Sequence, residues 1–129
     1  MSGIASVAFR DPVHGILGGG DVVASTVPQV NVARSGDGGV TWALTTPTPF
    51  PGAVYGLGYV PGGRLRQTVV ATGPGGAAWT PNEGDTWSVL PGVNNCWATV
   101  FATRKAGWLV CGAGRIVKVS FGGKSGDED

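Results

Sequence analysis

Short apolar segments bounded by glycine- or proline-rich turns recur along the whole chain. This pattern is typical of β-strands, which are bounded by turn residues in just this way. The expected strands are 6–9, 15–20, 30–35, 56–60, 68–73, 76–80, 98–102, 107–112 and 115–120, with further strands beginning at Trp42 and Trp87. Prolines or glycines interrupt every long window, so no 3.6-residue period is sustained and helices should be negligible. The pattern therefore predicts an all-β fold.

The clearest internal repeat is an eight-residue segment, SGDGGVTW at 35–42 and TPNEGDTW at 80–87. Both copies read hydroxyl, any residue, Asp or Asn, any residue, Gly, any residue, Thr, Trp, and the flanking strands repeat with them. Each unit holds four short antiparallel strands over about 40–50 residues, the size of one β-propeller blade. We predict one propeller-type domain over 1–129. Its three blades are expected at about 4–48, 53–92 and 96–121, followed by a tail at 122–129 that lacks a fourth strand.

The repeated segment has the composition of a tight turn between strands. Its glycines accept positive φ, and the side chain of Asp37 can accept hydrogen bonds from backbone N–H groups just ahead of it. Asn82 keeps the acceptor oxygen in the second copy but lacks the negative charge, which would weaken a metal loop and not a turn. We therefore predict a structural turn without a metal. Its members are Ser35, Asp37, Gly39, Thr41, Trp42, Thr80, Asn82, Gly84, Thr86 and Trp87.

The repeat resembles the Asp box, also called the BNR repeat, which lies at the outer turn between the third and fourth strands of β-propeller blades. SGDGGVTW matches the full pattern and TPNEGDTW is a variant of it. The segments SVAFRDPVHGILGGGD and AGWLVCGAGRIVKVS are similar to blades of the photosystem II stability and assembly factor group and its bacterial relatives. The resemblance implies a propeller fold. It implies little about activity, because Asp boxes occur in sialidases, sortilin-type receptors, glycan-active enzymes and scaffolds alike.

Three blades are too few for a closed propeller, which typically needs about four to eight. An open stack would expose the apolar sides of its first and last blades, which soluble monomers rarely tolerate. Two copies could bury these sides in a closed six-blade ring, so we predict a homodimer. The alternative is that the chain is a piece of a longer product or one part of a larger ring.

Composition narrows the range of partners. The 24 glycines and 9 prolines accompany 42% hydrophobic residues, which argues against a disordered chain. Only 13% of residues are charged and the net charge is +1, so neither nucleic acid nor an anionic membrane is expected as a partner. The start of the chain lacks the plan of a signal peptide and no apolar run approaches a membrane span, so we expect a soluble chain of unassigned compartment.

The two cysteines, Cys96 and Cys111, allow two interpretations. Both fall on what look like neighbouring strands, so a disulfide is one of them. Two buried reduced thiols are favoured, since free cysteine is among the most buried residue types. Two cysteines cannot form a four-thiolate metal site, and neither a metal nor a cofactor is expected.

The sequence offers little for catalysis. A sialidase-like glycosidase would need an arginine cluster, a tyrosine nucleophile assisted by a glutamate, and an aspartic acid. The glutamates are Glu83, inside the second box, and Glu128, in the tail, and both are poor positions for an inner pocket. The single histidine, His14, is expected in a turn between the first and second strands. No catalytic residue is therefore predicted.

Two groups of residues are candidates for binding. The loops between first and second strands should share one face, so the basic residues there form our predicted protein-binding surface, with solvated charge as the alternative. These residues are Arg64, Arg66, Arg104 and Lys105. Three tryptophans outside the boxes could stack on sugars, although packing is the usual role of tryptophans on strands. They are Trp79, Trp97 and Trp108. We expect a non-enzymatic interaction scaffold that self-associates and binds a protein, with a carbohydrate-binding module as the alternative.

Overall fold

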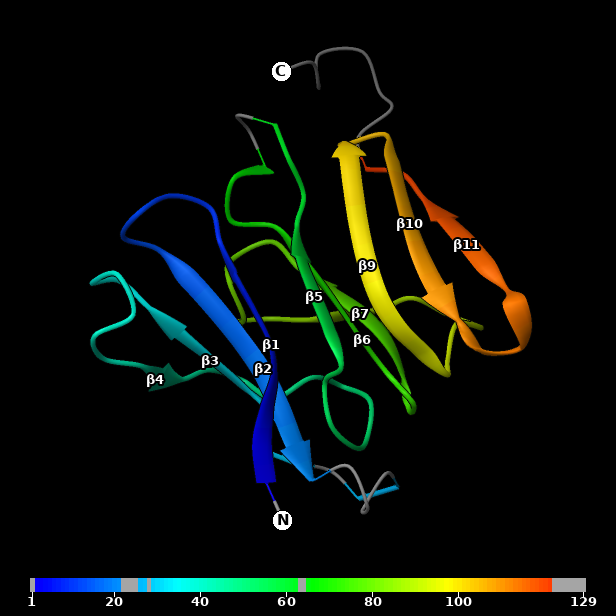
Figure 1. The fold of residues 1–129 in the computed structure, drawn as a ribbon, viewed down its shortest axis with the longest axis horizontal. Helices are drawn as coiled ribbons and strands as arrows, with labels where there is room; N and C mark the ends of the chain where they lie inside the picture. The colour runs from blue at the N-terminus through cyan, green and yellow to red at the C-terminus, as the bar shows by residue number, and fades with distance from the viewer. Residues whose placement is uncertain (1, 22–25, 28, 63–64, 122–129) are drawn as a thin grey trace.

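Three antiparallel sheets stand side by side in this computed structural model, which describes residues 2–21, 26–27, 29–62 and 65–121 (Figure 1). The predicted all-β fold is confirmed, with strands close to their expected positions. Blade 1 consists of β1 (Ser2–Phe9), β2 (Gly15–Asp21), β3 (Val32–Ser35) and β4 (Ala43–Leu44). Blade 2 consists of β5 (Gly56–Tyr59), β6 (Val69–Gly73), β7 (Gly76–Thr80) and β8 (Ser88–Val89). Blade 3 consists of β9 (Cys96–Thr103), β10 (Ala106–Cys111) and β11 (Ile116–Val119).

Each sheet is a simple up-and-down meander. The strands follow one another in the order of the sequence, and every neighbouring pair is antiparallel. A short 3-10 turn, η2 (Gly112–Gly114), connects β10 to β11. Blade 3 has three strands among the described residues, and the predicted tail at 122–129 lies outside them.

The first strands of the blades lie closest together. The strand β5 contacts β1 on one side and β9 on the other, as in the inner row of a propeller (Figure 1). Glycines permit this approach: a Cβ added to Gly56 would lie within 3 Å of backbone atoms of Trp97 and Ala98. The segments after β1, β5 and β9 consequently share one end of the stack, the upper end in Figure 1.

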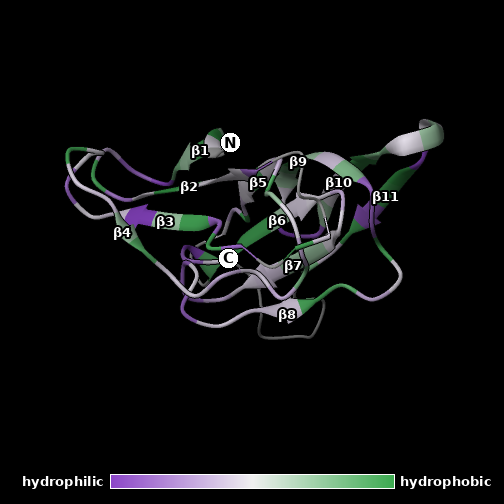
Figure 2. Ribbon diagram, turned by 90° about the horizontal axis from the view of Figure 1, so that it is seen from below, coloured by the Kyte–Doolittle hydropathy of each residue, from purple (hydrophilic) through white to green (hydrophobic). Residues whose placement is uncertain are grey.

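Two apolar clusters hold the blades together. We call the side of each sheet that points to the following blade its forward face and the other its rear face. The first cluster joins the forward face of blade 1, with Ile16 and Val32, to the rear face of blade 2, with Leu57 and Ala71. The second joins blade 2 to blade 3 around Leu109. The strand β6 contributes to both clusters and lies in the middle of the stack (Figure 2).

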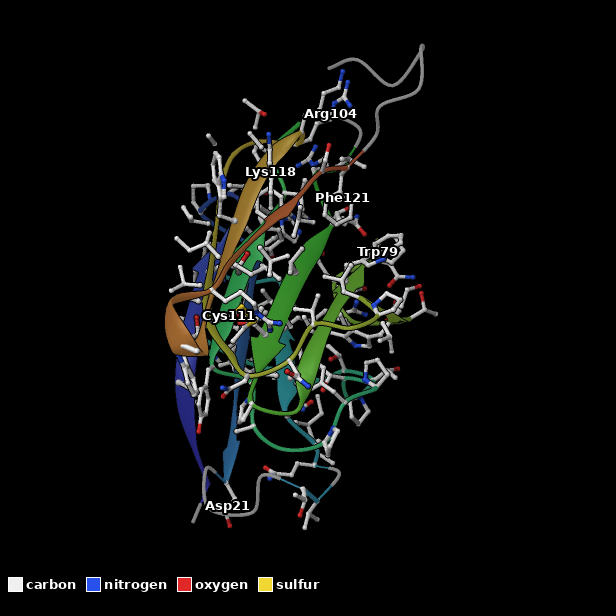
Figure 3. The ribbon with its side chains drawn as sticks, turned by 90° about the vertical axis from the view of Figure 1, so that its right-hand side faces the viewer. Asp21, Trp79, Arg104, Cys111, Lys118 and Phe121 are labelled. Carbon is white, nitrogen blue, oxygen red and sulfur yellow. A yellow bond between two sulfur atoms is a disulfide. The ribbon has the colours of Figure 1, made fainter. Side chains whose placement is uncertain are left out.

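Cys96 and Cys111 form a disulfide, so the expectation of two reduced thiols is wrong (Figure 3). Both residues are buried, as expected, but they also face each other directly across β9 and β10. A shift in register between Val110 and Cys111 brings about this pairing. Such a local irregularity of the ladder is not revealed by the pattern of apolar residues in the two strands.

The two ends of the stack expose apolar side chains. On the rear face of blade 1, Ile4 is 69% exposed and Leu44 is 73% exposed. On the forward face of blade 3, Ile116 is 65% exposed and Val100 is 58% exposed. In a closed propeller these positions would be covered by neighbouring blades.

Candidate functional site

The first repeated segment is a turn closed by its own side chains. The Ser35 hydroxyl accepts hydrogen bonds from the N–H groups of Asp37 (3.3 Å) and Gly39 (2.9 Å). The Asp37 carboxylate accepts from the N–H and the hydroxyl of Thr41. Contacts from the Thr41 hydroxyl, the Thr41 N–H and the Ser35 hydroxyl lower the pKa of Asp37 to about 2. The Trp42 indole N–H donates to the carbonyl of Gly39, 3.0 Å away.

The second segment repeats this scheme with an amide in place of the carboxylate. The Thr80 hydroxyl accepts from the N–H groups of Asn82 (3.3 Å) and Gly84 (2.9 Å), as Ser35 does in the first turn. The Asn82 Oδ1 atom accepts from the N–H of Thr86 (2.9 Å), while its Nδ2 donates to the Thr86 hydroxyl. The threonine hydroxyl therefore donates to Asp37 in the first turn but accepts from Asn82 in the second. The turn forms with no negative charge at its centre.

The second turn is also the junction between blades 1 and 2. The Arg34 guanidinium, from β3, donates to the carbonyls of Asn82 (3.2 Å) and Glu83 (3.4 Å). The chain after β4 pairs with the turn as well, through the Thr46 N–H and the carbonyl of Gly84 (3.0 Å). The Trp87 indole N–H donates to the carbonyl of Thr46 (2.8 Å), in contrast to Trp42, which bonds inside its own turn.

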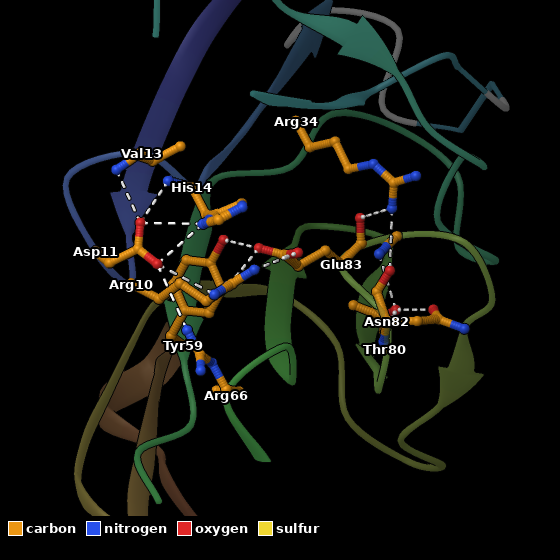
Figure 4. A network of polar contacts seen from close by, with 11 residues as sticks. Arg10, Asp11, Val13, His14, Arg34, Tyr59, Arg66, Thr80, Asn82 and Glu83 are labelled. Atoms are coloured by element: carbon orange, nitrogen blue, oxygen red, sulfur yellow. Dashed lines mark hydrogen bonds and ion pairs between the residues drawn. The ribbon is translucent and has the colours of Figure 1, made fainter. Parts of the chain in front are cut away.

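A buried ion pair lies beside this junction (Figure 4). The Arg10 guanidinium binds the Glu83 carboxylate through Nε (2.9 Å) and Nη2 (3.3 Å), and the Tyr59 hydroxyl donates to it at 2.7 Å. The side chains of Arg10 and Glu83 are 10% and 9% exposed. Burial opposes ionisation of Glu83, but hydrogen bonds from Arg10 and Tyr59 outweigh it, and the pKa of Glu83 lies below its usual range. Burial and the Glu83 carboxylate raise the pKa of Tyr59 well above its usual range.

Asp11 extends the network along the turn after β1. Its carboxylate accepts from the N–H groups of Val13 (2.8 Å) and His14 (2.7 Å), contacts the His14 ring, and pairs with Arg10 at 3.2 Å. Hydrogen bonds from the His14 ring and from the N–H groups of His14 and Val13 hold the pKa of Asp11 well below its usual range. Arg66 reaches the same carboxylate from the loop after β5, at 3.7 Å. His14 lies in a turn, as predicted from the sequence.

A cavity of about 510 Å³ opens where the three blades meet at this end of the stack. Blade 1 contributes Arg10, blade 3 contributes Phe101, and the rest of the lining comes from β5 and the loop that follows it. The lining from that segment is Tyr59, Val60, Pro61, Gly62 and Arg66. Two guanidinium groups and two aromatic rings therefore border one hollow. Such a lining can receive an apolar group that carries an anionic or polar end.

The predicted basic residues do not form one exposed surface among the described residues. Arg66 is exposed and lines the cavity, and Lys105 is exposed on the turn after β9. Arg104 does not belong to an exposed surface, because it is 6% exposed and donates to the carbonyl of Phe121 (3.4 Å). Its guanidinium bonds to the backbone just after β11, a contact between residues 17 positions apart that a place in the sequence does not reveal. Arg64 lies outside the described residues.

The three candidate tryptophans do not gather at one site. Trp97 is 43% exposed and stacks on Tyr55, with ring centroids 5.5 Å apart. Trp79 is half-buried and meets the edge of Phe121 at 5.4 Å. Trp108 is half-buried on the forward face of blade 3. None of them lines the cavity between the three blades.

The role of Glu83 does not follow from its position in the repeated segment, which predicts no place beside a pocket. The structure places its carboxylate against two residues that line the cavity, Arg10 and Tyr59. One signal could have indicated this. Glu83 stands where the first turn has Gly38, and both adopt positive φ, 54° and 77°. A glutamate in a conformation that favours glycine suggests that its side chain has a specific task.

The described residues were also considered for metal binding and for membrane-spanning helices, and they show neither feature. They contain no group of three or more His, Cys, Asp or Glu side chains arranged to hold a metal ion. Nor do they include a helix of the length and hydrophobicity needed to cross a membrane.

Comparison with solved structures places the fold among β-propellers. A structure described as YCF48 bound to D1 peptide matches with a TM-score of 0.64 and 18% identity, over 89% of this chain and 35% of that one. An ancestral GH74 enzyme matches with a TM-score of 0.55 and 12% identity, over 91% of this chain and 18% of the enzyme. The chain thus spans about a third or less of the length of these neighbours. No family model and no curated protein matches the sequence.

Proposed function

We propose that the protein is a non-enzymatic scaffold that binds a segment of a protein partner at the cavity between its three blades. The observation that carries this proposal is the convergence of Arg10, Tyr59, Arg66 and Phe101, from three different blades, on one hollow. The propeller neighbour described as bound to a peptide supports a peptide as the type of ligand.

The chemistry of the lining favours an extended peptide with a carboxylate beside an apolar side chain. The Arg66 side chain is 65% exposed and its ion pair with Asp11 is long at 3.7 Å, so it can turn toward a carboxylate. A guanidinium can bind a carboxylate through two parallel hydrogen bonds, which adds geometric specificity. Tyr59 and Phe101 offer flat apolar surfaces for the neighbouring side chain.

The same geometry argues against glycoside hydrolysis by Tyr59 and Glu83. The glutamate is already bound by Arg10 and by the tyrosine hydroxyl, and its lowered pKa makes it a weak base. The raised pKa of Tyr59 disfavours the phenolate that a nucleophile would need. Tyr59 and Glu83 therefore act as supports of the cavity wall.

A peptide array tests the proposed ligand class. Random heptapeptides would be displayed in two matched versions. The acidic version has a free C-terminal carboxylate or an internal Asp or Glu. In the neutral version the C-terminus is amidated and Asn or Gln replaces Asp or Glu. We expect selective binding of the acidic version, weakened about tenfold by Arg66→Ala. Arg115→Ala removes an exposed arginine far from the cavity and serves as the matched control. Equal binding of both versions, or equal effects of both substitutions, would contradict the proposal.

The carbohydrate-binding alternative has one exposed feature in its favour, the ring of Trp97. A glycan array with the parent chain and Trp97→Ala separates the two functions. Specific sugar binding that disappears with Trp97 would replace the peptide scaffold with a lectin. Turnover of a chromogenic glycoside that Glu83→Gln abolishes would establish an enzyme instead.

We further propose that the chain self-associates through the apolar faces at the two ends of the stack, as two copies forming six blades. The exposed Ile4 and Leu44 at one end and Ile116 and Val100 at the other support this. Sedimentation equilibrium should give twice the mass of the chain at micromolar concentration. A folded monomer at these concentrations would refute self-association without affecting the cavity.

A further inference from the structure

The forward face of blade 3 carries residues at the positions by which blades 1 and 2 pack against the next blade. In each blade the second and third strands pair in the same register, and one pair of facing residues points forward near the end where the third strand finishes. These pairs are Ile16 with Arg34, Val70 with Trp79, and Trp108 with Lys118. On the second strands, Ile16 and Val70 are completely buried but Trp108 is only half-buried. On the third strands, Arg34 and Trp79 are half-buried but Lys118 is exposed.

The rear face of blade 1 shows the converse arrangement. Leu17 faces Ala33 in the register position where blade 2 has Ala71 facing Ala78. Both alanines of blade 2 are fully buried against blade 1, but Leu17 is only half-buried. Leu44, which pairs with Ala33, is 73% exposed. Blade 1 therefore presents a surface of the kind that receives a preceding blade.

The two end faces also have complementary shapes, because one carries a larger side chain and the other has a hollow. The next forward-pointing position holds Gly18 in blade 1, which packs on Val54, and Val110 in blade 3. On the rear face of blade 1 the corresponding region is a hollow of about 250 Å³, whose lining includes Ile4, Leu17 and Gly19. The forward face of blade 3 thus carries the larger side chain, and the rear face of blade 1 carries the hollow.

We propose that the rear face of blade 1 in a second copy packs on the forward face of blade 3, with Lys118 bound to the first box turn of that copy. This inference rests on the proposed self-association and specifies its contacts. Lys118 occupies the position of Arg34, which donates to the carbonyls of Asn82 and Glu83 in the next blade. The corresponding carbonyls in a second copy belong to Asp37 and Gly38.

Charge favours this arrangement. Carbonyl oxygens and the exposed Asp37 carboxylate give the first turn a negative surface, and Lys118 is a cation amid the apolar residues of blade 3. Because both faces belong to one chain, two copies related by a two-fold axis can make the contact twice and close a ring. A second copy would therefore cover both end faces at once.

Photocrosslinking tests the contact directly. Lys118 would be replaced by the photocrosslinking residue benzoylphenylalanine. This variant would be mixed with isotope-labelled parent chain, so that crosslinks between two copies can be recognised by mass. We expect links from position 118 to residues 35–42 of the other copy. The same replacement at Lys105, an exposed lysine on the turn after β9, should give no such links.

Substitutions provide a second measurement. Lys118→Glu should weaken dimerisation about tenfold, and Ile116→Asp should weaken it more, because a charge would enter an apolar contact. Lys105→Glu makes the same charge change outside the face and should leave dimerisation unchanged. Circular dichroism would verify that each variant retains its strands.

The outcomes separate this inference from self-association itself. A dimer whose links from position 118 fall outside residues 35–42, or whose affinity is unchanged by Lys118→Glu, would overturn the proposed contact and leave the dimer standing. A folded monomer at micromolar concentration would overturn both, and would point to another chain or a longer propeller as the occupant of these faces.

Discussion

The two repeated turns, 35–42 and 80–87, share one internal scheme but have different surroundings. In both, a hydroxyl accepts two backbone N–H groups and an Asp or Asn closes the turn toward a threonine. The first turn, with Asp37, is largely exposed, whereas the second receives Arg10, Arg34 and the segment around Thr46 from blade 1. The comparison shows that the repeated motif builds a turn by itself, while residues outside the motif decide whether that turn also joins two blades.

The largest difference between the turns should come from Glu83. Glu83→Ala leaves the Arg10 guanidinium buried without its main partner, so we expect a loss of about 3 kcal/mol in the free energy of unfolding. Urea denaturation measures it. Glu83→Gln, which keeps the shape, should lose less. The control is Asp85→Ala, which removes the exposed ion pair with Arg34 and should cost no more than about 0.5 kcal/mol. Equal losses for Glu83 and Asp85 would mean that the buried pair does not join the blades.

The hydroxyl at the start of each turn should contribute similarly in both. Thr80→Val and Ser35→Ala each deprive two backbone N–H groups of an acceptor, at a cost of about 1–2 kcal/mol. Thr80→Ser keeps the hydroxyl and removes one buried methyl group, so it should cost about 0.8 kcal/mol. Denaturation curves of the three variants give the comparison. A loss at only one turn would show that the shared scheme does not stabilise both turns alike.

The two tryptophans should differ in where their effect is felt. Trp87→Phe and Trp42→Phe each remove one indole hydrogen bond, worth about 1 kcal/mol. Only Trp87 bonds to blade 1, so its loss should speed hydrogen exchange at the Thr46 N–H, which pairs with Gly84 across the junction. Exchange at that amide should be unaffected by Trp42→Phe. Faster exchange in both variants would indicate general loosening of the fold.

The sequence predicted the strands and the turns because both depend on local residues. The third strand of blade 2, expected at 76–80, is Gly76–Thr80 in the structure, and the hydroxyl, Asp/Asn and Thr positions of the box bond within the turn. The disulfide between Cys96 and Cys111 was not favoured, because it depends on strand register. The pairing of Arg10 with Glu83 spans 73 residues and depends on how two blades pack, so composition and spacing could not reveal it.

The smallest effect at neutral pH should come from exchanging the acid and the amide of the two turns. The pKa of Asp37 is lowered to about 2 in the folded protein, from an ordinary value near 4. Its charge therefore stabilises the fold above about pH 4, and this contribution is lost as the pH falls through about 2. Thermal melts at several pH values should give the parent chain a higher melting temperature than Asp37→Asn near neutral pH. The two melting temperatures should converge in acid. Asn82→Asp should gain the same acid dependence if the second turn offers the same hydrogen bonds. If Asn82→Asp melted at a lower temperature than the parent chain at every pH, the two turns would differ in their internal hydrogen bonds as well as in their surroundings.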